Sequence, residues 1–291
     1  MALEIVATEA TLGAVVRGVR LAALDDAEFA AIERAWDDHA VLVFPGQNLS
    51  EAEQVAFSRR LGPLERSLTA NNVGADPEVI VLSNMRDDGT LWPARSAHGL
   101  FLQGNNYWHT DSSYKRVPSK GSALAARVVP QTGGETAFAD MRAAWDALDA
   151  EMRGWLEDKR AVHSYAYSQG KVGGTEKLSK DEWDALPPVE HPIARRHPAT
   201  GRRSLYIGRH ASHIAGEDEE RSRALLERLC AEACRAPRVF THRWRAGDLV
   251  LWDNRCVLHR GLGHPADQKR HMTRTTLAGD GASNEWSLSA P

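Results

Sequence analysis

Cysteine is scarce in this sequence of 291 residues, which contains three, Cys230, Cys234 and Cys256. The number is odd and no two of them form a C-x-x-C pair, which excludes a disulfide scaffold and argues against a thiolate zinc site. Such sparing use of cysteine is typical of proteins from a reducing compartment. We therefore expect a cytoplasmic protein.

Long apolar runs and a strong charge imbalance are missing as well. No stretch approaches the roughly 20 apolar residues that span a bilayer, and the first residues lack the basic and then apolar pattern of a signal peptide. The net charge is −3 and 26% of the residues are charged, so no polyanion-binding surface is indicated. Neither a membrane nor a nucleic acid is an expected partner.

The sequence does contain helical patterns that alternate with many short apolar runs. Helices are predicted at 25–40, 50–62, 142–159 and 217–235, and strands at 40–44, 79–84, 122–129 and 204–208, with more strands in the last third. No glycine-rich phosphate loop accompanies them. Short strands, turns and outer helices together predict an α+β fold of two packed sheets, such as a jelly roll. We expect a single domain over 1–291.

The turns and loops carry two further predictions. Pro130 and the pair Gly133 and Gly134 separate the strand at 122–129 from E-T-A-F-A-D-M, which is typical of a β-hairpin. Residues 85–106 and 164–190 show no periodicity and are too long for simple connections. Long loops of this kind are commonly functional, so both are predicted to be active-site lids.

The clearest chemical motif is W-H-T-D-S-S-Y at 108–114. In an extended strand, residues two apart point to the same face, so His109 and Asp111 could bind one metal ion while Thr110 faces away. An ordinary surface strand is the alternative. A third ligand from elsewhere in the chain would decide between the two.

A candidate for that ligand is His259, in G-D-L-V-L-W-D-N-R-C-V-L-H-R-G at 247–261. Two histidines and one carboxylate on one face of a metal leave three positions open, as in non-haem Fe(II) oxygenases. Zinc more often has a closed tetrahedral site or three ligands plus water. Arg270 and Arg274 follow in one strand, and the planar guanidinium of either could bind a carboxylate through two hydrogen bonds.

Several motifs in order resemble those of the Fe(II)/2-oxoglutarate dioxygenases of the taurine dioxygenase and 2,4-dichlorophenoxyacetate dioxygenase family. They are L-V-F-P-G-Q, F-S-R-R-L-G-P-L-E, W-H-T-D, T-G-G-E-T, F-A-D-M-R-A-A-W-D-A-L, I-G-R-H-A-S-H and W-D-N-R-C-V-L-H-R-G. The resemblance covers nearly the whole chain and is strongest to the aryloxyalkanoate branch. It implies Fe(II), with 2-oxoglutarate and O2 as co-substrates, and a homo-oligomer.

The resemblance also implies roles for individual residues. His109, Asp111 and His259 would bind Fe(II), and Thr136, Trp252 and Arg270 would surround 2-oxoglutarate. The side chain predicted to bind the anionic group of the substrate is Arg274. Weaker candidates for the substrate pocket are Asn105, Ser113, His210 and His213.

The reaction implied is hydroxylation of a small anionic molecule with release of succinate and CO2. An aryloxyalkanoate would then lose its ether bond and yield a phenol and an oxo acid. An alkylsulfonate, a sulfate ester, an amino acid or a biosynthetic intermediate is the alternative substrate. Two other classes of protein, a metal-stabilised binding module and a zinc hydrolase, fit less well, because Arg270 would have no role in the former and no H-E-x-x-H motif supports the latter.

Overall fold

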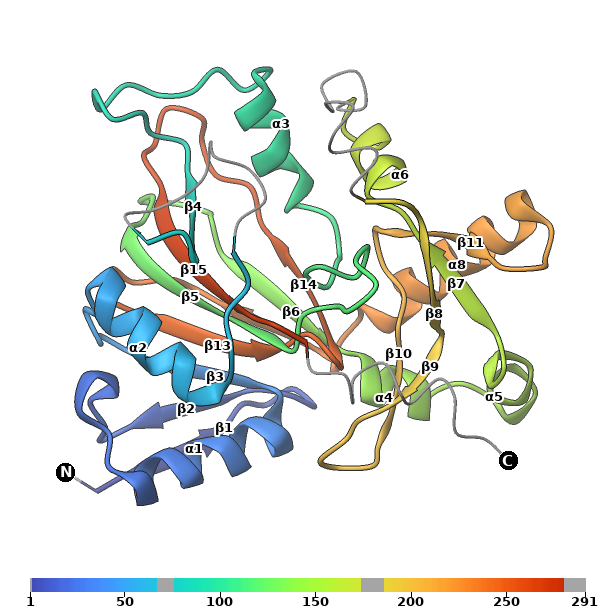
Figure 1. Ribbon diagram of the computed structural model, residues 1–291, viewed down its shortest axis with the longest axis horizontal. Coiled ribbons are helices and arrows are strands. Elements are labelled where there is room, and N and C mark those ends of the chain that lie inside the picture. Colours follow the sequence, from blue (N-terminus) through green and yellow to red (C-terminus); the bar gives the residue numbers. More distant parts are fainter. Residues whose placement is uncertain (1, 67–75, 174–185, 280–291) are drawn as a thin grey trace.

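The computed structural model describes residues 2–66, 76–173 and 186–279 (Figure 1). The helices are η1 (Leu21–Ala23, a 3₁₀ helix), α1 (Asp26–His39), α2 (Glu51–Leu61), α3 (Ala97–Gly104), α4 (Met141–Asp146), α5 (Ala150–Leu156), α6 (Tyr165–Gly170) and α8 (Glu219–Ala233). The strands are β1 (Glu4–Ala7), β2 (Ala14–Arg17), β3 (Val41–Phe44), β4 (Val79–Ser83), β5 (Gly121–Val128), β6 (Thr136–Asp140), β7 (Arg160–His163), β8 (Val189–Pro192), β9 (Ala194–Arg196), β10 (Arg203–Leu205), β11 (Ala211–Ile214), β12 (Val239–His242), β13 (Leu249–Asp253), β14 (Val257–Gly261) and β15 (His271–Leu277).

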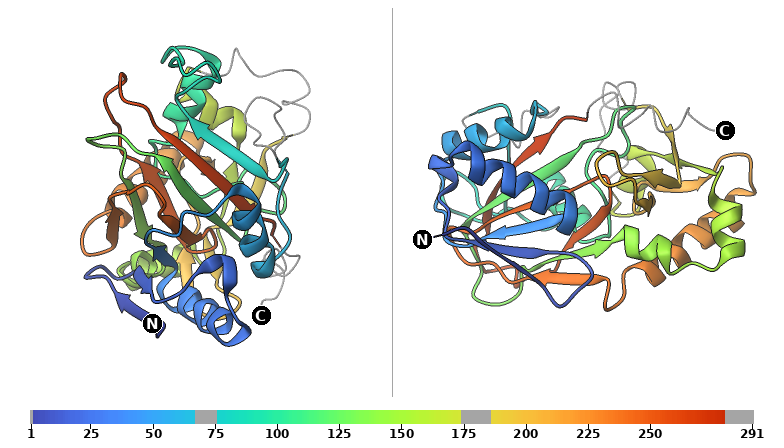
Figure 2. Two further views of the ribbon diagram at one scale, coloured as in Figure 1. Left: turned by 90° about the vertical axis from the view of Figure 1, so that its left-hand side faces the viewer. Right: turned by 90° about the horizontal axis from the view of Figure 1, so that it is seen from below.

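The described strands form four sheets. The largest has the order β1-β2-β3-β13-β5-β15-β4, and a sheet of three strands has the order β12-β6-β14. The others are β11-β7-β8 and β10-β9. Two views at right angles show α1 and α2 beside the large sheet, at the end of the molecule that also holds the N-terminus (Figure 2). The α+β class predicted from the sequence is confirmed.

Alternating side chains divide the core of the large sheet into two layers. Along β13, Leu249 and Leu251 pack with buried residues of α1 and α2, whereas Val250 and Trp252 pack toward the small sheet. Phe138 of β6 meets Trp252 with ring centroids 5.6 Å apart. Because strand side chains alternate between faces, one apolar strand can serve both layers. The second layer lies between the large and small sheets.

The two helices on the outer layer begin where the sequence predicts. Asp25 caps α1 and Ser50 caps α2, and in each helix the glutamate three residues later bonds back to the cap residue. This reciprocal arrangement satisfies backbone N–H groups that the first helical turn leaves unpaired. The start of each helix is therefore determined by nearby residues and can be predicted from the sequence.

The predicted β-hairpin of β5 and β6 is wrong. β5 pairs with β13 and β15 in the large sheet, whereas β6 pairs with β12 and β14 in the small sheet. Gly133 and Gly134, with φ angles of 74° and 77°, lie in the connection that leads from one sheet to the other. Glycine permits these angles in any turn, so the local sequence does not reveal which strands will pair.

Other boundaries differ because of local capping. The helix predicted at 142–159 is two helices, since Asp149 caps a new start and accepts a bond from the Met152 N–H at 2.7 Å. Segment 85–106 includes α3, capped by Ser96. The other predicted lid, 164–190, includes α6, but its residues 174–185 lie outside the described ranges.

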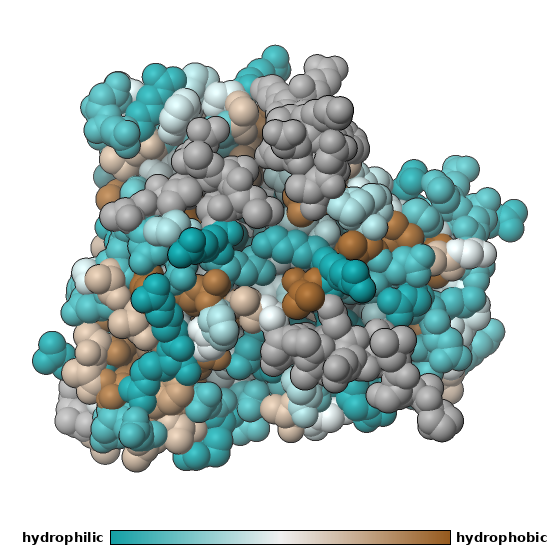
Figure 3. Space-filling view, in the orientation of Figure 1, coloured by the Kyte–Doolittle hydropathy of each residue, from teal (hydrophilic) through white to brown (hydrophobic). Residues whose placement is uncertain are grey.

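On the face shown in Figure 3, hydrophilic residues predominate and apolar residues form small, separate groups. Within the described ranges, none of the helices has the length and apolar content needed to cross a membrane. Buried apolar side chains form the two layers on either side of the large sheet and a third cluster among α4, α5, α8 and the smaller sheets.

A buried imidazole on β7 predicts how stability depends on pH. His163 is fully buried and stacks on Tyr206 at a centroid distance of 5.3 Å. Burial, reinforced by His191 and Arg195, holds the pKa of His163 well below its usual value. At low pH the imidazole is protonated in the unfolded chain but stays neutral in the native one. The contribution of His163 to the free energy of unfolding is therefore fully present above about pH 6.5 and is lost as the pH falls below that value.

When the pH is lowered from 7.5 to 5.5, the free energy of unfolding should decrease in both proteins. We expect the decrease to be about 1.4 kcal/mol smaller in the His163→Phe variant than in the wild type. Phenylalanine keeps a ring beside Tyr206 but cannot take up the proton. Urea unfolding at both pH values measures the difference, with circular dichroism as the check that each protein starts folded. An identical loss in the two proteins would contradict the burial argument.

Candidate active site

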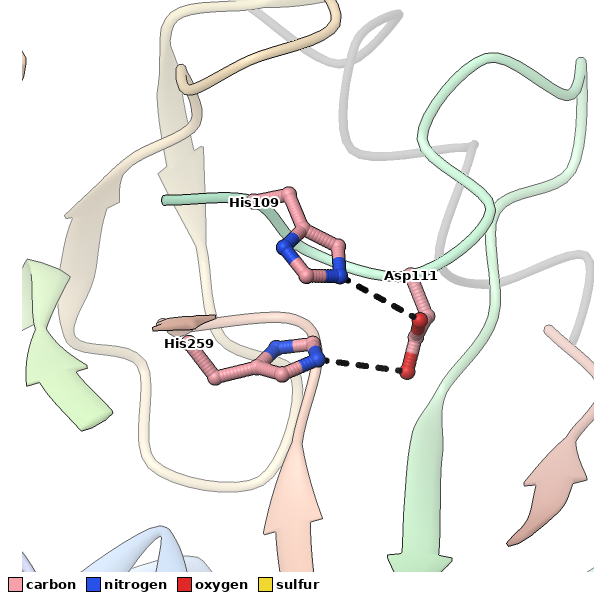
Figure 4. Close-up of side chains that lie close together, drawn as sticks. All are labelled: His109, Asp111 and His259. Carbon is pink, nitrogen blue, oxygen red and sulfur yellow. Dashed lines mark ion pairs between the residues drawn. The ribbon is translucent and has the colours of Figure 1, made fainter. Parts of the chain in front are cut away.

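The three candidate metal ligands meet in one buried cluster (Figure 4). His109 and His259 form an isolated antiparallel bridge in which each backbone N–H donates to the other carbonyl, at 3.0 and 2.7 Å. His109 Nε2 lies 3.9 Å from Asp111 Oδ1, and His259 Nε2 lies 3.8 Å from Asp111 Oδ2. The three side chains could hold one divalent metal ion between them.

The polypeptide around Asp111 aims alternate side chains in opposite directions. Thr110 points away from the cluster and its hydroxyl donates to the Asn254 carbonyl at 2.8 Å. Directly after Asp111, Ser112 has a left-handed backbone with φ of 56° and ends the extended segment. The observed arrangement matches the reasoning that residues 109 and 111 share a face.

The protonation of the imidazoles suits metal binding. His109 Nδ1 lies 2.7 Å from the Tyr107 carbonyl oxygen, which can only accept, so Nδ1 carries the hydrogen and Nε2 keeps a lone pair. Burial lowers the pKa of His109 to about 4, against the opposing effect of Asp111. Burial, with His109 beside it, also holds the pKa of His259 well below its usual value. Both rings are therefore neutral near pH 7, as metal ligands must be.

The carboxylate between them is ionised. Burial by itself would raise the pKa of Asp111, but the charge of Arg274, with the hydrogen bond from Ser122, outweighs burial and holds it well below its usual range. Arg274 Nη1 lies 2.6 Å from Oδ1, and the Ser122 hydroxyl donates to Oδ2 at 2.7 Å. An anionic ligand beside two neutral imidazoles is the donor set of a 2-His-1-carboxylate site.

A cavity of about 230 Å³ opens beside this cluster. Its lining includes His109 and His259 together with the predicted co-substrate residues Thr136, Trp252 and Arg270. The Trp252 ring packs against His259 with centroids 4.6 Å apart. The cavity therefore joins the metal-binding cluster to the residues predicted to surround 2-oxoglutarate.

Arg270 is the positive charge in this cavity that lacks a counter-ion. Within the described part of the chain, no carboxylate forms an ion pair with it, and burial lowers its pKa to about 10. Thr136 is buried nearby, and its hydroxyl oxygen accepts a hydrogen bond from Trp244 Nε1 at 2.9 Å. The threonine hydrogen is then free to donate to an anion. A partly buried guanidinium that lines the same cavity as a hydroxyl donor suits a carboxylate ligand.

The candidates for the substrate pocket are spread more widely. Asn105 lines the cavity and its carbonyl accepts from the Gly261 N–H at 2.8 Å. His210 is buried against Tyr114, at a centroid distance of 4.9 Å, and lies 6.3 Å from the His109 ring. Ser113 is buried but does not line the cavity. On β11, His213 has Nδ1 2.9 Å from the Ser212 hydroxyl and Nε2 4.0 Å from Glu219, and it is not part of the cavity lining.

Sequence reasoning missed the polar residues that support the cluster from behind. Ser122 contacts the carboxylate of Asp111, and Asn254 contacts the Asp111 backbone N–H and the Thr110 hydroxyl. Asn254 stands in the same motif as His259, but its residue type alone predicts only a turn. Burial of its amide, visible only in the fold, is the missing signal.

A second group of possible ligands, His197, Asp253 and Cys256, is structural. Arg255 binds both oxygens of Asp253, at 2.8 and 2.5 Å, and His197 Nε2 lies 2.8 Å from Oδ2. Burial raises the pKa of the Cys256 thiol above its usual range. This ion-paired group fixes the turn between β13 and β14.

Comparison with known proteins agrees with this geometry. Residues 5–276 match the family described as taurine catabolism dioxygenase TauD, TfdA family. The chain belongs to this family. It is 44% identical to an (S)-phenoxypropionate/alpha-ketoglutarate-dioxygenase from Sphingobium herbicidovorans, over 97% of both chains. It is 42% identical to an alpha-ketoglutarate-dependent 2,4-dichlorophenoxyacetate dioxygenase from Cupriavidus pinatubonensis, over 89% of this chain and 91% of the other.

Among solved structures, the fold is similar to that of AAD-2 in complex with Mn(II) and N-oxalylglycine. The TM-score is 0.89 and the identity 37%, with 100% of each chain covered. The resemblance inferred from the sequence motifs is confirmed, and the chain is an enzyme of the 2-oxoglutarate-dependent, non-haem iron class.

We expect the His259→Gln variant to bind Mn(II) at least about tenfold more weakly than the wild type, because one of three neutral or anionic ligands is lost. Isothermal titration calorimetry on metal-free protein measures this. His39→Gln is the matched control, since His39 ends α1 on the opposite face of the large sheet. Equal affinities for the wild type and the His259 variant would show that the metal binds elsewhere.

Proposed function

We propose that this chain is an Fe(II)- and 2-oxoglutarate-dependent dioxygenase that hydroxylates aryloxyalkanoates. The single observation that carries the proposal is one cavity lined by both histidines of the metal-binding cluster and by Arg270, a cation with no ion-pair partner among the described residues. A metal centre alone would not need that cation. A chelating keto acid with a second, distant carboxylate needs both.

The substrate class is supported by the relatives. Two (S)-phenoxypropionate/alpha-ketoglutarate-dioxygenases share 44% and 45% identity with this chain over at least 95% of its length. A sulfate ester dioxygenase from Pseudomonas putida is less similar, at 32%. An aryloxyalkanoate is therefore the first choice and a sulfate ester or alkylsulfonate the second.

Each residue of the site would have a defined task. His109, Asp111 and His259 would hold Fe(II), and Arg270 with the free Thr136 hydrogen would bind the far carboxylate of 2-oxoglutarate. When bound, ferrous iron and 2-oxoglutarate supply the oxidising chemistry that the side chains lack. Trp252 closes the wall beside His259 and helps to exclude water.

The substrate would be held at the other arginine. Arg274 contacts Asp111 through Nη1, so an anion bound to its remaining N–H groups lies next to the metal cluster. This position would place the carbon between carboxylate and ether oxygen near the reaction centre. Asn105, which lines the cavity, and His210, whose ring lies 6.3 Å from that of His109, are the side chains proposed to shape the rest of the pocket, whereas Ser113 and His213 remain weaker candidates.

The products follow from bond counting. One atom of O2 enters succinate as 2-oxoglutarate loses CO2, and the other becomes a hydroxyl group on the substrate carbon. Because that carbon also carries the ether oxygen, the hemiketal or hemiacetal collapses, the ether bond breaks and a proton goes to the departing phenol. The oxo acid remains. A carboxylate at position 111, where halogenases of this class need room for halide, favours hydroxylation.

The fold and lids complete the proposal. We take the core to be a double-stranded β-helix, or jelly roll, because the large sheet and the β12-β6-β14 sheet pack face to face on one apolar layer. A single domain over 1–291 is the organisation that this shared core favours. Segment 85–106 supplies cavity-lining residues from Trp92 to Asn106, which supports its role as a lid. The other proposed lid is 164–190.

Substrate-stimulated formation of succinate tests the proposed reaction. With Fe(II), 2-oxoglutarate and both enantiomers of 2-phenoxypropionate, we expect succinate and phenol in equal amounts, measured by chromatography. Taurine and an alkyl sulfate are the comparison substrates, and release of sulfite or sulfate would favour the second choice. Succinate formation that none of these compounds stimulates would remove the substrate assignment.

The Arg270→Gln variant should raise the KM for 2-oxoglutarate by roughly ten- to a hundredfold, since a hydrogen bond to a charged group contributes about 1.5–3 kcal/mol. The KM for the aryloxyalkanoate should change much less. The control is Arg235→Gln, because Arg235 is an exposed partner of Glu232 at the end of α8. If only the KM for the aryloxyalkanoate rose, Arg270 would be the residue that binds the substrate, and Arg274 would be the candidate for binding 2-oxoglutarate.

A further inference from the structure

We infer that Asn254 is a positioning residue that fixes the carboxylate of Asp111 for metal binding, acting through Ser122. The inference rests on the proposed function, because it takes Asp111 to be a metal ligand. Asn254 lies in the turn between β13 and β14 and is 1% exposed. Its side chain bonds to the Asp111 backbone, to Ser122 beside the Asp111 carboxylate and to Trp252 in the cavity wall.

The turn that holds Asn254 is rigid. Its neighbour Asp253 accepts bonds from the backbone N–H and the Nε of Arg255, both at 2.8 Å. His197 Nε2 lies 2.8 Å from the second carboxylate oxygen. Because all of these groups are buried, the ion-paired turn holds the Asn254 backbone in one place.

The orientation of the Asn254 amide is determined by its partners. Trp252 Nε1 can only donate, and it lies 2.9 Å from Oδ1, which must therefore be the oxygen. The Asp111 backbone N–H lies 3.3 Å from the same oxygen. The amide nitrogen then donates to the hydroxyls of Ser119 and Ser122, at 2.9 and 3.0 Å. Every polar atom of the side chain is used.

This orientation also decides where the serine hydrogens point. Each serine oxygen accepts a hydrogen from Asn254, so its own hydrogen is available for Asp111. Ser122 donates to Asp111 Oδ2 at 2.7 Å, and Ser119 donates to the Asp111 carbonyl at 2.9 Å. The amide of Asn254 therefore holds both hydroxyls in the direction that anchors Asp111.

The same amide connects two parts of the site. Trp252, which bonds to Asn254 Oδ1, packs on the His259 ring at 4.6 Å. Asn254 thus ties the carboxylate ligand to the wall beside the second histidine. Partners behind a ligand that fix its orientation typically change metal affinity by 10- to 100-fold when removed.

An aspartate at position 254 would have nearly the same shape but the opposite effect. Both of its oxygens accept, so Ser119 and Ser122 would turn their hydrogens toward residue 254 and away from Asp111. It would also place a second negative charge near the carboxylate of Asp111. Asn254→Asp therefore tests whether the direction of the hydrogen bonds matters, because it changes that direction and leaves the packing nearly the same.

The experiment measures Mn(II) affinity of the full-length, metal-free protein by calorimetry and the visible absorption of bound Co(II), which reports ligand geometry. We expect Ser122→Ala and Asn254→Asp each to weaken Mn(II) binding by about tenfold or more and to alter the Co(II) spectrum. In the double variant the combined loss should be smaller than the product of the two single losses, since both changes remove the hydrogen bond from Ser122 to Asp111. Ser222→Ala is the matched control, because it removes a buried hydroxyl on α8, remote from Asp111.

Folded Ser122→Ala protein with wild-type affinity and an unchanged Co(II) spectrum would overturn the inference, as would a multiplicative loss in the double variant. Thermal unfolding establishes that each protein is folded, and Ser122→Ala alone decides the question if Asn254→Asp does not fold. Wild-type protein that binds no Mn(II) would instead refute the proposed function. The two failures are therefore distinguishable.

Discussion

The site depends on one short piece of backbone pairing. The two reciprocal hydrogen bonds between His109 and His259 join segments that are far apart in the sequence. Two residues that lie directly opposite each other in an antiparallel pair have side chains that are neighbours on the same face. The backbone pairing by itself therefore brings the two imidazoles together. Asp111 follows two residues later on the same face. The metal-binding geometry is therefore a consequence of strand register.

Burial then gives the charged groups their chemical character. Both histidines are neutral because protonation would place a cation in a desolvated cluster, and Asp111 stays ionised because Arg274 lies beside it. Arg270 has no such partner among the described residues and keeps its charge in the cavity. Charges interact more strongly where water is excluded, so this cavity favours an anionic ligand.

Much of the architecture follows from local rules. The capping boxes at Asp25 and Ser50 begin helices where the sequence predicts, and short apolar runs form the buried strands. Partner choice does not follow such rules. The residues that connect β5 and β6 are typical of a β-hairpin turn, yet the two strands belong to different sheets. The reason is that strand pairing is decided by the long-range packing of both faces.

The sequence by itself determined the donor atoms: two histidines and an aspartate for a metal, and two arginines for anions, in motifs specific enough to indicate the family. Only the tertiary structure decided how these groups are supported and which are already paired. Arg274 contacts Asp111, whereas Arg270 has no ion-pair partner in the described ranges, and Asn254 lies behind the carboxylate. Residue type states what a side chain can donate or accept. Its partners depend on burial and on contacts between distant segments, which no local pattern contains.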